Sequence, residues 1–121
     1  MYRDRLRPCP GCASPLHGVA VALTSRETVL AHVCEVCGGT FVDYFAGEPV
    51  MIARAIARAG GRPDRPPRPR VLATCPDCER ELVILPYLED GPLLWRCPAC
   101  LGMFATARQL RDLADFEQWV D

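Results

Sequence analysis

Two pairs of apolar stretches, each pair separated by a short polar turn, predict two β-hairpins. In the first, residues 18–23 and 28–33 are rich in Val, Leu and Thr and flank the polar residues 24–27. In the second, residues 82–88 and 93–96 flank the turn residues 89–92. Short apolar runs bounded by turn residues are typical of paired strands. A single hairpin is marginal in water, so we expect each one to be held by other interactions.

Apolar residues at helical spacing follow the second hairpin. Thr106, with Gln109 three residues later, forms a capping-box signature that predicts the start of a helix. The helix is expected to continue to the C-terminus, because apolar residues recur at the spacing of one helical face. These residues are Leu110, Leu113, Phe116 and Val120.

A second helix is predicted after the first hairpin, from Pro49 to Ala59. Proline is tolerated in the first turn of a helix, and the glycines at positions 60 and 61 end it. Only Arg54 and Arg58 interrupt an otherwise apolar circumference. Because such a helix is normally covered on more than one side, we expect a second cover, either the other half of the chain or another chain.

Residues 61–70 contain four prolines and four arginines. Proline keeps the backbone extended and removes hydrogen-bond donors, so this segment is expected to be a semi-rigid spacer. The predicted organisation is a first domain over residues 1–60, a linker over 61–70 and a second domain over 71–121. Domains of this size bury little apolar surface and usually need a metal, disulfides or a partner.

All eight cysteines fall into four C-x-x-C pairs, one on each side of each predicted hairpin. Two such pairs supply the four thiolates of a tetrahedral zinc site, so the sequence predicts two Zn²⁺ ions, one per domain. Iron takes the same ligands and remains an alternative metal. The predicted ligands are Cys9, Cys12, Cys34 and Cys37 in the first domain, and Cys75, Cys78, Cys97 and Cys100 in the second.

Three other interpretations of the cysteines are weaker. Disulfides are typical of secreted chains, and the N-terminal residues do not resemble a signal peptide. A redox C-x-x-C motif occurs singly at the start of a helix, whereas each pair here has its own mate. A catalytic zinc keeps one position open for water, whereas four thiolates close the shell. We therefore expect a protein that is not an enzyme, located in the cytoplasm and without a membrane span.

The two halves are a sequence repeat. A shift of 66 residues maps the first cysteine pair onto the third, and a shift of 63 maps the second pair onto the fourth. The second shift also maps Gly39 onto Gly102 and Phe41 onto Phe104. We expect Phe41, Phe104 and Trp95 to pack over the metal-binding turns. His17 and His32 have no counterparts in the second half and are expected to be ordinary hairpin residues.

Charge is distributed unevenly along the chain: residues 1–60 carry six arginines and five acidic residues, residues 61–70 four and one, and residues 71–121 four and nine. The formal net charge is −1, and all 14 basic residues are arginines. Two four-thiolate zinc sites would lower the charge to about −5. Nucleic-acid affinity comes mainly from neutralising phosphates, so an acidic protein is a poor candidate for general nucleic-acid binding.

The second cysteine pair of each half resembles the small bacterial zinc-ribbon family named for its similarity to transcription factor IIB. That family has the pattern C-P-x-C, a hairpin, C-P-x-C-x-G-x-W-L-D-x-G-E-L and then a helix. Residues 97–104 are similar to it, as are residues 9–16 and 34–43, although Phe41 and Phe104 replace the family tryptophan. The resemblance implies a small metal-stabilised α+β fold of two zinc ribbons, each a β-hairpin with two cysteine knuckles followed by an α-helix.

These observations favour a non-catalytic adaptor that binds a protein partner or a second copy of itself. We expect it to use the apolar helix faces and residues 93–95 of the second hairpin, with Val50, Met51, Ile52, Ile56 and Trp95 as its contact residues. The alternative is a nucleic-acid or transcription-associated protein that uses the basic first domain and the linker. Its contacts would be Arg54, Arg58, Arg62, Arg65, Arg68 and Arg70.

Overall fold

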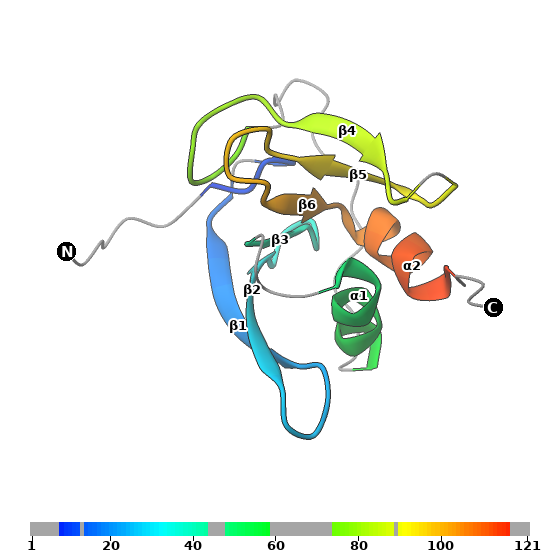
Figure 1. Cartoon of the computed structure of the whole chain (residues 1–121). Helices are drawn as coiled ribbons and strands as arrows, with labels where there is room; N and C mark the ends of the chain where they lie inside the picture. The colour runs from blue at the N-terminus through cyan, green and yellow to red at the C-terminus, as the bar shows by residue number, and fades with distance from the viewer. Residues whose placement is uncertain (1–7, 13, 44–47, 59–73, 89, 117–121) are drawn as a thin grey trace.

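The computed structural model describes residues 8–12, 14–43, 48–58, 74–88 and 90–116 (Figure 1). Within them, all six strands form one antiparallel sheet in the order β1-β2-β3-β6-β5-β4, so the fold is a small α+β arrangement. Along the chain the elements are β1 (Leu16–Ala22), β2 (Thr28–Cys34), β3 (Thr40–Val42), α1 (Pro49–Arg58), β4 (Val83–Pro86), β5 (Leu93–Arg96), β6 (Met103–Ala105) and α2 (Ala107–Asp115).

Both predicted hairpins form. β1 pairs with β2 over seven residues, and β4 pairs with β5 over four. The Leu23 N–H donates to the Glu27 carbonyl at 2.8 Å and closes the first turn. In the second half, β4 ends at Pro86, two residues before the predicted limit. Leu88 there has φ of 59°, which is left-handed backbone incompatible with a continuing strand.

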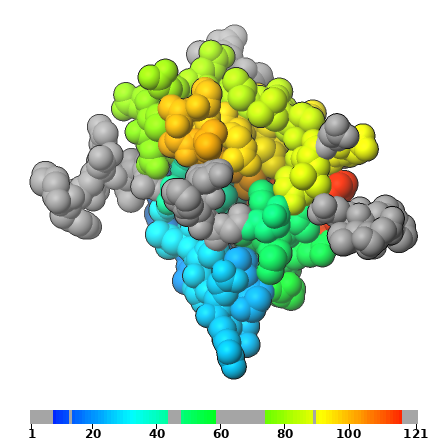
Figure 2. All heavy atoms as spheres, viewed as in Figure 1, coloured from blue at the N-terminus to red at the C-terminus, as the bar shows by residue number. Residues whose placement is uncertain are grey.

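A junction between two short strands makes the sheet continuous. β3 pairs with β6, with Phe41 opposite Phe104 at the centre and Thr40 opposite Ala105. Equivalent strands of the two repeats therefore meet at the centre of the sheet. Counted from either edge, the first, second and third strands of one repeat follow in the same order as those of the other. The first and second halves of the described chain thus lie against one another (Figures 1 and 2), and the register of β3 with β6 is symmetric about the pair Phe41 and Phe104. The sequence did not predict these two strands.

The two faces of the sheet carry different cores, because side chains alternate along a strand. On one face, residues such as Val42, Leu94 and Met103 form an apolar core with both helices. On the other face, Phe41 and Phe104 pack among the cysteines. The prediction that Phe41, Phe104 and Trp95 pack beside the metal-binding turns is therefore confirmed.

α1 and α2 pack against each other, and α1 also contacts β1 (Figure 1). Ile52 and Ile56 on α1 are buried in the core that includes Leu110 and Leu113 of α2. The second half of the chain therefore supplies the second cover that the apolar composition of α1 required. Residues 61–70, the predicted linker, lie outside the described residues.

The predicted capping box at the start of α2 is confirmed. Thr106 accepts a hydrogen bond from the Gln109 N–H, and the Gln109 side chain accepts one from the Thr106 N–H. The helix ends at Asp115, earlier than the predicted C-terminal limit. Phe116 is the C-cap in an extended conformation, and its ring packs edge-to-face against Tyr87 with centroids 5.7 Å apart. Val120 lies outside the described residues.

Candidate metal centre

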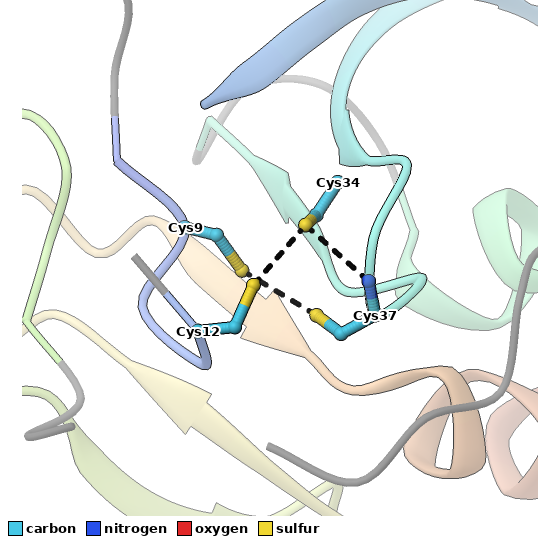
Figure 3. Close-up of side chains that lie close together, drawn as sticks. All are labelled: Cys9, Cys12, Cys34 and Cys37. Atoms are coloured by element: carbon cyan, nitrogen blue, oxygen red, sulfur yellow. Dashed lines mark hydrogen bonds between the residues drawn. The ribbon is translucent and has the colours of Figure 1, made fainter. Parts of the chain in front are cut away.

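The first cysteine cluster is built from the two turns that flank the first hairpin (Figure 3). Cys9 and Cys12 lie in the turn before β1, Cys34 ends β2, and Cys37 lies in the turn before β3. The Sγ atoms of Cys9 and Cys37 are 3.6 Å apart, and those of Cys12 and Cys34 are 3.4 Å apart. All four sulfurs lie within 4.8 Å of one another and point toward a common centre.

The second cluster repeats this construction. Cys75 and Cys78 come from the turn before β4, and Cys97 and Cys100 come from the turn between β5 and β6. The Sγ atoms of Cys75 and Cys100 are 3.7 Å apart, and the four sulfurs again lie within 4.8 Å of one another.

The spacing of the sulfurs fits a metal ion better than a disulfide. A zinc–sulfur bond of about 2.3 Å places the corners of a tetrahedron about 3.8 Å apart. A disulfide would require about 2.05 Å, and all eight cysteines are free. Each cluster can therefore hold one metal ion.

The turn after each hairpin has the same backbone geometry in both halves. The Gly38 N–H donates to the Cys34 carbonyl, and the Leu101 N–H donates to the Cys97 carbonyl, both at 2.9 Å. This turn needs left-handed backbone after the second cysteine. Gly38 adopts it at φ 81°, whereas Leu101 adopts it at φ 64° despite its side chain.

These turns also direct backbone N–H groups at the sulfurs. Gly39 and Gly102 donate to Cys37 and Cys100, each at 3.4 Å, and comparable bonds reach other cysteines of both clusters. An N–H that donates to a sulfur favours the thiolate, which is the form that binds metal.

The pKa values of the thiols diverge within each cluster. Burial raises the pKa of Cys75 to about 12, whereas a hydrogen bond from Cys9 lowers that of Cys37 to about 5. The pKa of Cys97 falls to about 7 although burial raises it, because backbone N–H groups donate to its sulfur. Some thiols therefore keep their protons in the absence of a cation, and metal binding would release them.

The two clusters differ in exposure. The four cysteines of the first cluster are all buried. In the second cluster, Cys75 and Cys97 are buried, but Cys78 and Cys100 are only half-buried. The sequence did not indicate this difference, because the two sets of cysteines have the same motif.

The expected partner-contact residues occupy different environments. Ile52 and Ile56 are 0% and 4% exposed, so the chain itself covers them, and they are not available to a partner in this arrangement. Val50 and Trp95 are half-buried against the two cores. Met51 is 41% exposed and is the most accessible of the five.

Arg54 and Arg58 are both exposed on α1, but Arg54 is engaged within the chain. Its Nε donates to the Ala114 carbonyl at 3.0 Å, and its Nη2 donates to the Phe116 carbonyl at 2.7 Å. The guanidinium therefore satisfies the C-terminal end of α2, where positive charge is favourable. The predicted phosphate contacts Arg62, Arg65, Arg68 and Arg70 lie outside the described residues.

A second apolar surface extends beyond residues 93–95, the part of the second hairpin that the sequence indicated. Val83, Ile84 and Leu85 of β4 are 42–44% exposed, and Leu93 of β5 is 49% exposed; we call these four residues the β4 surface. The repeat could have revealed it, because a shift of 66 residues aligns this part of β4 with the His, Gly and Val at positions 17–19 of β1. The other edge strand thus forms without such a run of large aliphatic residues.

The histidines lie where they were expected. His17 is exposed on β1 and His32 is half-buried on β2. Neither belongs to a cysteine cluster within the described part of the chain. No helix that the structure describes is long and apolar enough to cross a membrane.

Comparisons with protein-family models, with curated proteins and with solved structures gave no match for this chain.

Proposed function

We propose that this protein is a non-catalytic zinc-binding adaptor of the cytoplasm, built from two zinc ribbons, that associates through the β4 surface. The pair of four-cysteine clusters is the observation that carries this proposal. Four thiolates fill a tetrahedral shell, which is the arrangement of structural zinc, whereas catalytic zinc keeps a position for water. The metal therefore supports the fold, and the surfaces around it carry the function.

Zinc is the proposed metal because four cysteines are the usual ligands of structural zinc sites. Elemental analysis of protein purified from its native host is expected to find two zinc ions per chain. A chelator should then unfold both halves, because metal binding contributes directly to the folding of small domains. One ion per chain, or a coloured iron form, would contradict the proposal.

The β4 surface supports an association role because the fold does not require it. Edge strands are usually protected by charges, and an exposed apolar edge is a site of pairing with another chain. On the opposite edge, β1 carries exposed His17, Gly18 and Ala20 where β4 carries Val83, Ile84 and Pro86. The same architecture thus tolerates polar and small residues at these positions.

A second copy of the chain is the occupant that we propose for this surface. Its residues are uncharged and aliphatic, with Val83 and Leu85 on one face of the sheet and Ile84 and Leu93 on the other. Two copies that pair edge to edge along β4 about a twofold axis would therefore place apolar side chains beside apolar side chains on both faces. At 42–49% exposure the four residues expose roughly 300 Å² per copy, divided between the two faces of the sheet, so the area on each face is smaller than a typical functional patch. This is less than the roughly 800 Å² per partner of a standard interface. We therefore expect a weak, concentration-dependent dimer.

Light scattering across a concentration series tests this assignment. The zinc-loaded protein is expected to increase in mass from 13.4 kDa toward a dimer as its concentration rises. Ile84→Ser should remain a monomer. Leu30→Ser is the matched control, because Leu30 is 52% exposed and aligns with Leu93, but lies outside the β4 surface. It should behave as the wild type.

Two results would refute self-association through the β4 surface. One is a monomer at every concentration, and the other is equal behaviour of the two variants. A different protein that binds in a zinc-dependent manner and is lost in Ile84→Ser would assign the surface to that partner instead.

The nucleic-acid alternative has less support. Arg54 is occupied by carbonyl groups of α2, and the formal net charge is −1. Duplex or single-strand binding at low salt that weakens steeply with added salt would favour this alternative over the adaptor.

A further inference from the structure

The two metal sites form an internal comparison, because the repeat aligns each cysteine of one with a cysteine of the other. Cys9 and Cys34 are 1% and 0% exposed, and their counterparts Cys75 and Cys97 are equally buried. The remaining two positions differ. Cys12 and Cys37 are each 4% exposed, whereas the aligned Cys78 and Cys100 are half-buried. The second site therefore has two cysteines that solvent partly reaches, whereas all four cysteines of the first site are buried.

Exposure decides how easily a thiolate reacts with an oxidant. A thiolate is the reactive form of cysteine, and its susceptibility to oxidation follows its accessibility. Metal ligands are thiolates, so a peroxide that reaches one of them can attack it. The two partly exposed cysteines belong to one cluster whose sulfurs all lie within 4.8 Å of one another, so they are close enough to form a disulfide with each other after a small movement.

We propose that the second site is an oxidation-sensitive metal site and the first is not. A peroxide takes two electrons from the thiolates of Cys78 and Cys100. An S–S bond forms between them, the O–O bond breaks to give two hydroxide ions, and the metal leaves as a divalent cation. This inference rests on the proposed function, because it requires a metal in each cluster.

Loss of the second metal affects the proposed contact surface. The cysteines of the second site lie at the base of the β4–β5 hairpin, and Trp95 of β5 packs in the same cluster. A hairpin of four residues per strand has little stability of its own. Oxidation therefore loosens the hairpin that carries the β4 surface, and the adaptor loses its association in oxidising conditions.

The test uses the full chain loaded with two zinc ions. Hydrogen peroxide is added with a chromogenic chelator that reports free zinc, and a sample without peroxide gives the background rate. We expect one zinc equivalent to appear at least tenfold faster than the second. In the same samples, light scattering should show loss of the dimer during the fast phase, and a thiol reductant with added zinc should restore it.

Peptide mapping at the end of the fast phase identifies the oxidised cysteines in the wild-type chain, so no ligand needs to be mutated. Cleavage after Arg80 and Arg96 separates the two cysteine pairs of the second site, and fragmentation distinguishes Cys78 from Cys75. A disulfide between Cys78 and Cys100 is expected.

Release of both equivalents at one rate, or a first disulfide within the first site, would overturn the inference and leave the zinc proposal intact. Absence of zinc from the purified protein would instead contradict the proposed function itself.

Discussion

Each half of the molecule places its phenylalanine on the metal-binding turn of the other half. A Cβ added to Gly102 would lie 2.5 Å from Cζ of Phe41, and one added to Gly39 would lie 2.6 Å from Cζ of Phe104. Ordinary carbon contacts are about 3.5–4.0 Å, so either methyl group would be about 1 Å too close. The two rings are at most 1% exposed and have no free space to enter.

Gly102→Ala is therefore expected to destabilise the zinc-loaded protein. Overpacking of a filled core costs about 1–3 kcal/mol. A shorter side chain at position 41 should relieve the steric clash. The loss of unfolding free energy caused by Gly102→Ala should therefore be about 1 kcal/mol smaller in a Phe41→Leu background. Such coupling would arise only if Phe41 and Gly102 contact each other across the β3–β6 junction.

Thermal unfolding at a fixed excess of zinc measures both effects. A loss of 1 kcal/mol corresponds to a fall in Tm of about 4 °C for a domain of this size. Gly18→Ala is the control, because its added Cβ meets the end of the exposed Leu30 side chain at 3.3 Å and His32 Nδ1 at an ordinary contact distance of 3.9 Å. The reasoning is refuted if Gly102→Ala behaves like this control, or if its cost is the same with Phe and with Leu at position 41.

Three further predictions concern single residues. Arg54→Gln removes two hydrogen bonds to the end of α2 and should cost about 1–2 kcal/mol in denaturant unfolding, whereas Arg58→Gln on the same helix should cost clearly less. Thr40→Val replaces a buried hydroxyl that has no hydrogen-bond partner among the described residues and should stabilise the protein by about 1 kcal/mol; a lower Tm would contradict this. Burial, assisted by the hydrogen bond to Glu48, raises the pKa of Tyr87 to about 12, because the folded state favours the neutral phenol. The stability that Tyr87 gains in this way is complete below pH 10 and is lost as the pH rises through 12. An absorbance titration should show one tyrosine titrating near pH 12, and Tyr87→Phe should remove that step.

Local pattern predicted the elements that depend on local interactions. The two hairpins, the capping box at Thr106 and the start of α1 at Pro49 all follow from turn residues and helical spacing. β3 and β6 were missed because each has only three residues, and their pairing joins positions 61 to 65 residues apart. No periodicity of the chain specifies a contact of that kind.

In the candidate site, too, local features were predicted and long-range contacts were not. The eight cysteines were predicted to form two groups, and they do, because the spacing within each pair fixes how the sulfurs converge. The contact surface was assigned less well. The apolar composition of a helix indicates that it is buried, but not whether the same chain or another chain buries it. Ile52 is covered by the second half of the same chain. The exposure of Ile84 became visible only when both edges of the sheet could be compared.

The pairing of β3 with β6 makes this chain equivalent to a homodimer whose two subunits have been tethered. A tether raises the effective concentration of the two halves to the millimolar range or above, so their association no longer depends on the amount of protein present. The tether also allows the sequences of the two halves to differ. In a true homodimer every substitution appears twice, and both metal sites and both outer strands must be alike. A single chain can keep one site closed while it opens the other, and can keep mainly small residues exposed on one edge strand while it exposes large aliphatic residues on the other.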